Sequence, residues 1–393
     1  MDEKEFREKA IKRFENGESP KEIYQSFGKS KAWFFKWLSR YRHEEEDWAQ
    51  SRSKRPHHTS KKIDITMEQA IIETRKRRER QLYAQIGALS ISYDLQQQGM
   101  TPLPLSTINK VLKRNELVRK RPKYTPTGVD YPSLQIIESN YVHQFDVVGP
   151  RHLKTDGRFY SANFMDAYDR RCSVNPKRRQ TRIDIAQALI RSWQTLGMPC
   201  YLQLDNKLPS RGSNRYPHSF GLVIRLCLHL GIQPIFIPIK EPWRNGIIEH
   251  FQNVFDKMFF RAQYFESFSY LVQQAWGFET FHNKYHRYST MEGKTPLEKV
   301  SGKLKYLQKD FRLPEKLTIA PGHIHIIRFI RSNRILDIFG EKFAMPMEVE
   351  YEYVWATIDT AAQKLNIYHD SKLVDQILYS VPKTSLELSN IDL

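Results

Sequence analysis

Residues 141–148 read Tyr-Val-His-Gln-Phe-Asp-Val-Val, an alternating run of side chains that ends close to an acidic residue, Asp146. A second run, residues 200–206, reads Cys-Tyr-Leu-Gln-Leu-Asp-Asn and brings Asp205 to a similar position. A period of two residues predicts β-strands in a partly buried sheet. Both carboxylates should therefore lie at the rim of that sheet, where a negative charge is costly without a cation or a polar partner.

A third acidic residue, Glu249, follows Pro-Trp-Arg-Asn-Gly (242–246), a segment that is typical of a helix start. A lone Asp at a strand end is more often a turn-former than a metal ligand. Three carboxylates on neighbouring elements, however, predict an oxygen-rich cluster that suits Mg²⁺ or Mn²⁺. Two such ions about 3.5–4 Å apart can stabilise the attacking and leaving oxygens of a phosphoryl displacement. We expect Asn206 and Asn245 to support the carboxylates by hydrogen bonds.

The charge of the chain indicates a polyanionic partner. Among 393 residues, 62 are Lys or Arg and 44 are Asp or Glu, a formal net charge of +18. A basic protein without such a partner is the alternative. No apolar run of about 18 residues occurs, so we expect no membrane association, and the N-terminus lacks the apolar core of a secretory signal. The three cysteines form no CxxC pair, which argues against a structural zinc site and favours a cytoplasmic protein.

Residues 1–45 have the pattern of a helix-turn-helix domain. The predicted helices cover 3–15, a brief middle segment, and 31–42, which Ser30 can cap. A basic, aromatic helix after a tight glycine turn is typical of the element that enters the DNA major groove. A small helical bundle without a DNA role would have the same pattern. The residues expected to contact DNA are Lys31, Lys36 and Arg40.

Residues 46–65 form a basic linker with no periodic apolar face, in which we expect Arg55 to contact phosphates. A solvated tether is the alternative interpretation, and the two are compatible.

Residues 66–125 repeat the helical pattern and predict a second helix-turn-helix domain. A basic helix covers 67–80, an amphipathic helix covers 87–98, and Ser106 is expected to cap a third helix over 107–115. The residues expected to face a DNA groove are Thr107, Asn109, Lys110 and Lys113.

The remainder of the chain is rich in strands. Residues 135–302 alternate strands with helices, which predicts a mixed α/β core. Residues 317–382 contain short, evenly spaced strands, which predict a small C-terminal β-barrel. The predicted fold is therefore multidomain, with two all-α modules, a central α/β core and a barrel.

Three further residues of the core are candidates for function. Lys257, two turns beyond Glu249, is expected to contact DNA near the site, although a solvated lysine fits equally well. His282 and His286 are four residues apart on a predicted helix, a spacing that can bind a metal. No third ligand is obvious, so histidines of the core or surface are the favoured interpretation.

The core resembles the DDE integrase and transposase superfamily, which has a ribonuclease-H-like fold, and is most similar to bacterial insertion-sequence transposases. The resemblance covers nearly the whole chain, including both helix-turn-helix modules and the barrel. The matching segments are Arg55-Pro-His-His58, His143-Gln-Phe-Asp146-Val-Val-Gly149, Asp166-Ala-Tyr-Asp-Arg170, Leu204-Asp-Asn206, Pro242-Trp-Arg-Asn-Gly-Ile-Ile-Glu-His-Phe251, His282-Asn-Lys-Tyr-His-Arg287 and Gly293-Lys-Thr-Pro296.

Three features depart from the family pattern. The segment 206–248, between Asp205 and Glu249, is longer than the family usually has. Lys207 stands where a glycine usually follows Asp-Asn, and His250 stands where a basic residue usually follows the Glu. These changes concern the loop near the site and leave the three carboxylates in place.

The resemblance implies a DNA transposase in which Asp146, Asp205 and Glu249 are catalytic and hold two Mg²⁺ or Mn²⁺ ions. It implies metal-dependent 3′-end cleavage and strand transfer into target DNA, carried out by a homo-oligomer bound to the terminal repeats of the element. The expected location is the cytoplasm, in association with the nucleoid. Two alternatives stay open, a catalytically silent transposase-derived regulator and an architectural DNA-bridging protein. No phosphate-binding P-loop occurs, so we expect no NTPase in this chain.

Overall fold

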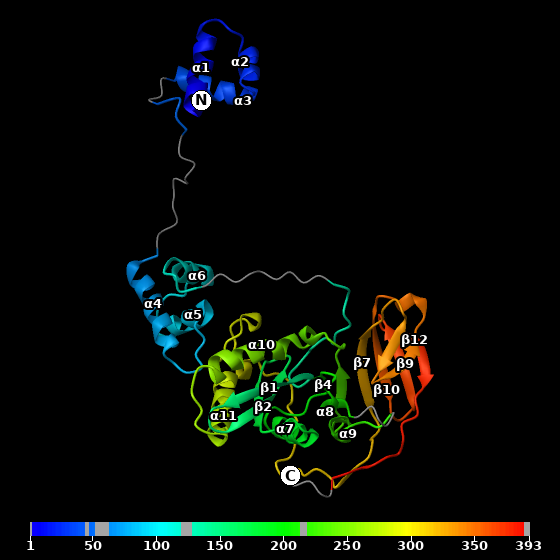
Figure 1. Cartoon of the computed structure of the whole chain (residues 1–393). Helices are drawn as coiled ribbons and strands as arrows, with labels where there is room; N and C mark the ends of the chain where they lie inside the picture. Colours follow the sequence, from blue (N-terminus) through cyan, green and yellow to red (C-terminus); the bar gives the residue numbers. More distant parts are fainter. Residues whose placement is uncertain (1, 44–46, 52–62, 119–127, 213–217, 389–393) are drawn as a thin grey trace. The chain divides into compact units, whose positions relative to one another are not determined.

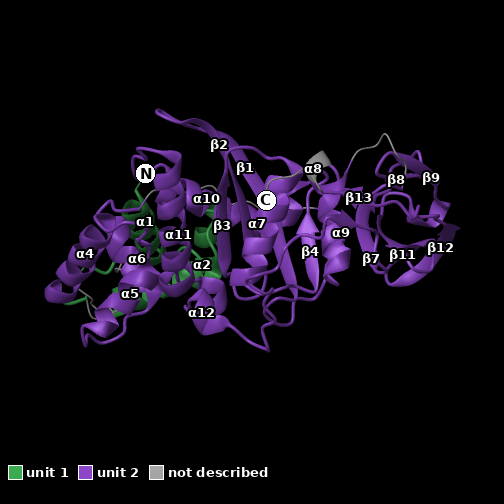
Figure 2. Ribbon diagram, turned by 90° about the horizontal axis from the view of Figure 1, so that it is seen from below, with its two compact units in different colours: residues 1–64 green, residues 65–393 purple. Residues whose placement is uncertain are grey.

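The computed structural model describes residues 2–43, 47–51, 63–118, 128–212 and 218–388. Contacts divide the chain into two compact units, residues 1–64 and residues 65–393 (Figure 2). Arg55 and most of the predicted linker lie outside the described residues. Within the described ranges, no helix has the length and apolar character needed to cross a lipid bilayer.

The first unit contains three helices at the positions that the sequence predicts. These are α1 (Glu3–Glu15), α2 (Pro20–Ser26) and α3 (Lys31–Arg42). The side-chain oxygens of Ser19 and Ser30 each accept a backbone N–H from the first turn of the helix that follows, which satisfies a donor that the helix itself cannot pair. The buried core of this unit consists of Ala10, Ile11, Ile23, Phe34 and Leu38.

A second group of three helices opens the larger unit. These are α4 (Ile65–Glu79), α5 (Ala88–Gln97) and α6 (Leu105–Arg114). The predicted cap at Ser106 is wrong, because α6 begins one residue before it and has Pro104 as its N-cap residue. The proline ring restricts the chain to an extended conformation up to Pro104, so the helix can start directly after it.

The loop between α4 and α5 packs this helical group against α11 (Phe268–Tyr285). The ring of Tyr83 contacts the rings of Phe278 and Phe281 edge-on, with centroid distances of 5.3 and 5.7 Å. The side-chain oxygen of Gln85 accepts the backbone N–H of Arg287 at 2.7 Å. The second helical module therefore shares a packed interface with the α/β core.

One sheet of nine strands, in the order β12-β11-β10-β7-β5-β4-β1-β2-β3, is the centre of the larger unit. Strands β1, β2 and β3 form an antiparallel meander, and β4 and β5 run parallel to β1. The core is thus the mixed α/β structure that the sequence predicts. Its strands are β1 (Val142–Leu153), β2 (Gly157–Asp166), β3 (Cys172–Lys177), β4 (Tyr201–Leu204) and β5 (Gln233–Phe236).

Helices cover both faces of this part of the sheet (Figure 1). Alternate residues of β2 face opposite ways: Phe164 packs with α7 (Arg182–Thr195) and α9 (Leu222–His229), whereas Phe159 packs with α11 and α10 (Gly246–Phe255). The shorter helical segments are α8 (Leu208–Arg211), η1 (Pro242–Asn245), η2 (Asp256–Phe260), η3 (Ser289–Met291), α12 (Pro296–Lys299) and η4 (Met347–Val349).

The C-terminal strands β7, β10, β11 and β12 continue the central sheet, whereas β6 pairs with β13 and β8 with β9 in two small sheets, and a separate barrel is not confirmed. Strand β7 pairs in parallel with β5, with Ile235 opposite His325 and Phe236 opposite Ile326. This pairing satisfies an edge of β5 whose backbone groups would otherwise lack partners. The C-terminal strands are β6 (Lys316–Leu317), β7 (His323–Phe329), β8 (Ile335–Ile338), β9 (Glu341–Ala344), β10 (Tyr353–Asp359), β11 (Lys364–His369), β12 (Lys372–Leu378) and β13 (Leu386–Glu387).

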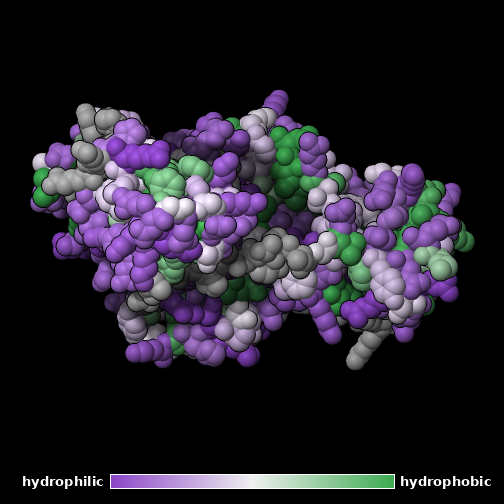
Figure 3. Space-filling view, turned by 90° about the horizontal axis from the view of Figure 1, so that it is seen from above, coloured by the Kyte–Doolittle hydropathy of each residue, from purple (hydrophilic) through white to green (hydrophobic). Residues whose placement is uncertain are grey.

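The hydrophobic core is continuous across this junction. Ile326, Val354 and Leu365 of the C-terminal strands belong to the same buried cluster as Phe236 of β5 and Leu226 of α9. The face shown in Figure 3 is mostly hydrophilic, with hydrophobic residues in small groups. The apolar side chains of β7, β10 and β11 that join this cluster are therefore buried, whereas Leu373 and Leu378 of β12 are exposed.

A fragment of residues 65–302 should not fold as an independent domain. It lacks β7, so the edge of β5 and the apolar face of α9 would be exposed to solvent. We expect aggregation or a non-cooperative thermal transition by circular dichroism. The matched fragment 65–393 should melt cooperatively. A soluble, cooperatively melting 65–302 fragment would show that the C-terminal strands are a separate domain after all.

Candidate active site

The parallel pairing of β1 with β4 brings the two strand-end aspartates together. Val142 lies opposite Tyr201, and Gln144 lies opposite Gln203. The same register extended by two residues sets Asp146 beside Asp205, which directly follows β4. Because side chains alternate along a strand, both carboxylates emerge on the same face as the two glutamines.

A lysine ammonium lies between these carboxylates. The Nζ atom of Lys207 is 2.9 Å from Oδ2 of Asp205 and 3.6 Å from Oδ1 of Asp146. Both carboxylates are mainly buried, with side-chain exposures of 25% for Asp205 and 27% for Asp146. The two side chains thus share one position suited to a cation.

The local charges shift the pKa values of this group. Burial raises the pKa of Asp146, and the Asp205 charge raises it further, while the Lys207 ammonium opposes both effects. Burial alone lowers the pKa of Lys207, but its contacts with Asp205 and Asp146 raise it above the ordinary value. The negative charge of Asp205 therefore makes Asp146 costlier to ionise, and the Lys207 ammonium between them reduces that cost.

Glu249 lies in the first turn of α10, close enough to Asp146 to be influenced by its charge. Burial raises the pKa of Glu249, and the negative charge of Asp146 adds to that rise. Among the described residues, however, no three His, Cys, Asp or Glu side chains surround a single ion position as they stand. The structure therefore brings Asp146 and Asp205 to one cation position, with Glu249 nearby but not at it.

Two glutamines hold the start of α10 against the sheet. The side-chain oxygen of Gln144 accepts the backbone N–H groups of Ile247 and Ile248 at 3.1 and 3.0 Å. The side-chain nitrogen of Gln203 donates to the backbone oxygen of Arg244 at 3.0 Å and to the Asn245 side-chain oxygen at 2.8 Å. Helix N-termini have unpaired N–H groups, so these contacts set the position of the turn that carries Glu249.

The sequence contains a signal for these glutamines that our interpretation of it missed. Gln-Phe-Asp at 144–146 and Gln-Leu-Asp at 203–205 are the same polar-apolar-acidic triplet on the two strands. A spacing of two residues places the polar side chains on one face. The repeat therefore indicates that each glutamine side chain lies on the same face of the sheet as the aspartate that follows it.

The structure gives Asn206 and Asn245 hydrogen-bond partners other than the carboxylates that we expected them to support. Asn245 donates to the backbone oxygen of Phe145 at 3.1 Å and so fastens α10 next to Asp146. Asn206 donates to the backbone oxygen of Ile237 at 2.6 Å and accepts from Nη2 of Arg328 at 2.7 Å. Both residues position backbone near the site.

Arg328 connects the C-terminal strands to the loop that follows β4. It is 5% exposed, and besides Asn206 it donates to the backbone oxygens of Ile237, Ile327 and Asp337. Burial lowers the pKa of Arg328 to about 10. A buried guanidinium needs such a set of acceptors, so β7 and the Asp205 loop are held in one arrangement.

The residues predicted to bind DNA lie on several elements. Lys31 and Lys36 are exposed on α3, whereas Arg40 donates to the backbone oxygen of Gln50 and lies over the Trp37 ring. On α6, Thr107 is partly exposed and Asn109, Lys110 and Lys113 are exposed. Lys257 is exposed on η2, after α10. A role in DNA binding stays a prediction for all of them.

His282 of α11 and His286, which directly follows that helix, are buried core residues. His282 contacts the Tyr288 hydroxyl at 2.8 Å and the Cys172 sulfur at 3.3 Å, and His286 contacts the Gln85 amide at 2.9 Å. Burial lowers the pKa of His282 to about 4 and that of His286 to about 2. Both rings are therefore neutral at physiological pH, and the contact between His286 and Gln85 helps to hold the α4–α5 loop on the core.

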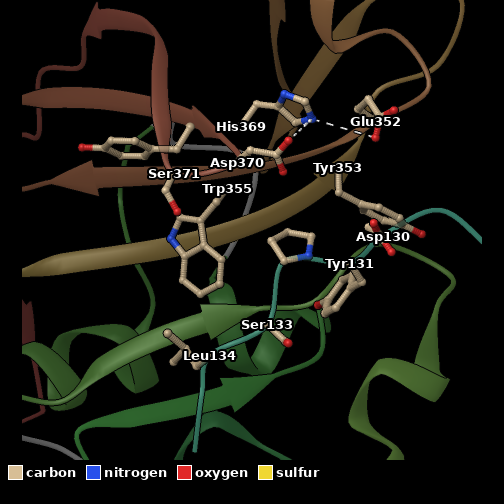
Figure 4. A pocket seen from close by; sticks show the side chains of 12 residues that line it. Asp130, Tyr131, Ser133, Leu134, Glu352, Tyr353, Trp355, His369, Asp370 and Ser371 are labelled. Carbon is tan, nitrogen blue, oxygen red and sulfur yellow. Dashed lines mark ion pairs between the residues drawn. The ribbon is translucent and has the colours of Figure 1, made fainter.

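A cavity of about 650 Å³ lies between residues 130–134 and strands β10 and β11 (Figure 4). Tyr131, Tyr353 and Trp355 line it, and His369 lies 3.9 Å from Glu352 at its rim. None of the three carboxylates of the candidate site lines this cavity. It is therefore a separate feature of the C-terminal strands.

No family model and no curated protein matches the chain. Among solved structures, two are forms of the HTLV-2 integrase catalytic core domain in complex with magnesium, dimeric and trimeric. They align at 17% and 16% identity over 42% of this chain and 99% and 100% of theirs, with TM-scores of 0.32 and 0.33. A chain of the simian T-cell lymphotropic virus intasome in complex with PP2A regulatory subunit B56 gamma aligns at 16% identity over 75% of this chain and 95% of its own, with a TM-score of 0.37. Likeness at this level does not establish a shared activity.

Replacing Gln144 with alanine should lower the free energy of unfolding of the protein by about 1–2 kcal/mol, because two backbone N–H groups at the start of α10 lose their acceptor. Urea unfolding followed by circular dichroism measures this loss. The control Gln308→Ala, at an exposed position of the connector between α12 and β6 (residues 300–315), should change stability by less than about 0.5 kcal/mol. Equal effects of the two substitutions would contradict the capping role of Gln144.

Proposed function

We propose that this protein is a DNA transposase of the integrase type, which cleaves 3′ ends and transfers strands in a metal-dependent reaction. The observation that carries the proposal is the pairing of Asp146 with Asp205 around one cation position at the rim of the sheet. Glu249 on the adjacent helix and the net charge of +18 support it, as does the resemblance of the sequence motifs to the superfamily.

The donor set of the site suits magnesium or manganese. Mg²⁺ is usually bound by one or two carboxylates together with water and substrate phosphates, and the ammonium of Lys207 already marks a cation position between Asp146 and Asp205. Those two residues would hold a divalent ion, and Glu249 would contribute to a second one. Bound ions of this kind stabilise the attacking and leaving oxygens of a phosphoryl transfer.

The chain itself would bind and orient the DNA. Basic side chains of α3, α6 and η2 would contact phosphates of the terminal repeats and of the target, and Gln144, Gln203 and Asn245 would keep Glu249 beside the reacting phosphate. Hydrolysis at the end of the element frees a 3′-hydroxyl, which then attacks a target phosphodiester and displaces the 3′-oxygen of that strand. A homo-oligomer would hold two ends together, in the nucleoid of the cell.

A catalytically silent DNA-binding regulator is the second candidate. The observation that favours it is the ammonium of Lys207 at the position where a divalent ion would bind. All three carboxylates are nevertheless present, and only the active enzyme gives each of them a function, so we favour it.

The substitution Asp205→Asn should abolish cleavage and strand transfer of a labelled DNA end in Mg²⁺ while DNA binding in a mobility-shift assay survives. The reason is that a neutral amide cannot replace a carboxylate that holds the ion. Asp310→Asn, at an exposed position of the connector, is the matched control and should keep full activity. Strand transfer by the Asp205→Asn protein would contradict the catalytic assignment of Asp205.

The exposed face of α6 should contribute phosphate contacts. The double substitution Lys110→Gln and Lys113→Gln should weaken binding to all duplexes and reduce the slope of log K against log salt by about 2, since each phosphate contact contributes about 0.9. Fluorescence anisotropy at several salt concentrations measures the slope. The control Lys303→Gln with Lys309→Gln removes the same charge from the connector, and an equal loss of slope there would rule out a specific role for α6.

A further inference from the structure

Lys207 stands out as a cation that the chain itself supplies to the candidate site. Its ammonium contacts both aspartates, at 2.9 and 3.6 Å, and its backbone N–H donates to Oδ1 of Asp205 at 3.1 Å. The backbone contact keeps the residue beside Asp205 whatever the side chain does. About half of the side chain, 52%, is exposed to solvent.

The Lys207 ammonium lies between Asp146 and Asp205, where a divalent ion would also bind, so only one of the two cations can be there at a time. Two carboxylates in one partly buried place repel each other and need a counter-charge. A cation at contact distance from both satisfies that need, but a second cation there would meet strong like-charge repulsion. The lysine stem is flexible and leads to solvent, so the ammonium can leave the site without a change in the backbone.

We propose that Lys207 is a resident counter-ion of the Asp146–Asp205 pair, that it competes with the divalent cation for this position, and that it thereby sets the metal affinity of the site. The proposal rests on the proposed function, because it takes the two aspartates to be metal ligands. Without metal, Lys207 keeps the carboxylates together and the site closed to catalysis. Metal binding must displace the ammonium, which makes the site respond to metal at a higher concentration than the bare carboxylates would.

Binding of Mn²⁺ to the full chain, measured by isothermal titration calorimetry without DNA, tests the competition. The variant Lys207→Gln should bind Mn²⁺ roughly tenfold more tightly than the natural chain, since no ammonium has to be displaced. Lys207→Arg keeps the positive charge and should bind close to the natural affinity. The control Lys309→Gln removes one charge from the connector and should leave the affinity unchanged.

A second measurement follows the counter-ion role without any activity. In EDTA, Lys207→Gln should melt at a lower temperature than the natural chain, because the paired carboxylates lose their cation. Added Mn²⁺ should then raise its melting temperature by more than it raises that of the natural chain. Lys207→Arg should behave like the natural chain in both conditions.

The outcomes separate this proposal from the proposed function. Mn²⁺ affinity that is unchanged or weaker in Lys207→Gln, with Asp205→Asn still abolishing Mn²⁺ binding, would overturn the counter-ion role and leave the metal site intact. Mn²⁺ binding by Asp205→Asn at the natural affinity would instead overturn the metal site, and the counter-ion proposal would fail with it.

Discussion

The parallel pairing of β1 with β4 is the constraint on which the rest of the site depends. It sets the same triplet, a glutamine followed two residues later by an aspartate, side by side on two strands. The glutamines hold the backbone at the start of α10, and the aspartates meet at the sheet rim. One register therefore fixes both the carboxylate pair and the helix that carries Glu249. A slip by one residue would turn every one of these side chains to the opposite face.

The C-terminal strands take part in the same arrangement. The pairing of β7 with β5 extends the sheet through β7, β10, β11 and β12, and the shared hydrophobic core removes the boundary that a separate domain would have. Arg328 then reaches from β7 to Asn206 and to the backbone at the end of β5. Since a buried guanidinium left without acceptors is strongly unfavourable, this residue resists any movement of the Asp205 loop relative to β7.

The electrostatics of the buried carboxylates is the second constraint on the site. Asp146 and Glu249 have raised pKa values because they are partly buried and lie near further negative charge. Carboxylates gathered in this way need a cation to offset their mutual repulsion, and in the structure the Lys207 ammonium is that cation. The identity of the cation, ammonium or divalent metal, is thus the variable on which the chemistry of the site turns.

Much of the local structure could be predicted from the sequence, because helix caps and side-chain periods act over a few residues. The helices at 3–15 and 31–42 begin and end as the pattern indicates, and the alternation around Asp146 and Asp205 predicts their strands. Short-range signals were insufficient at Ser106, where the rigid backbone of Pro104 starts the helix earlier. The sequence by itself determined the helices, the strands and the three acidic candidates. Only the tertiary structure decided that β7, β10, β11 and β12 join the central sheet, that Asn206 accepts a hydrogen bond from Arg328, and that Lys207 lies between the aspartates. Each of these depends on contacts between residues far apart along the chain or on the space left between packed elements.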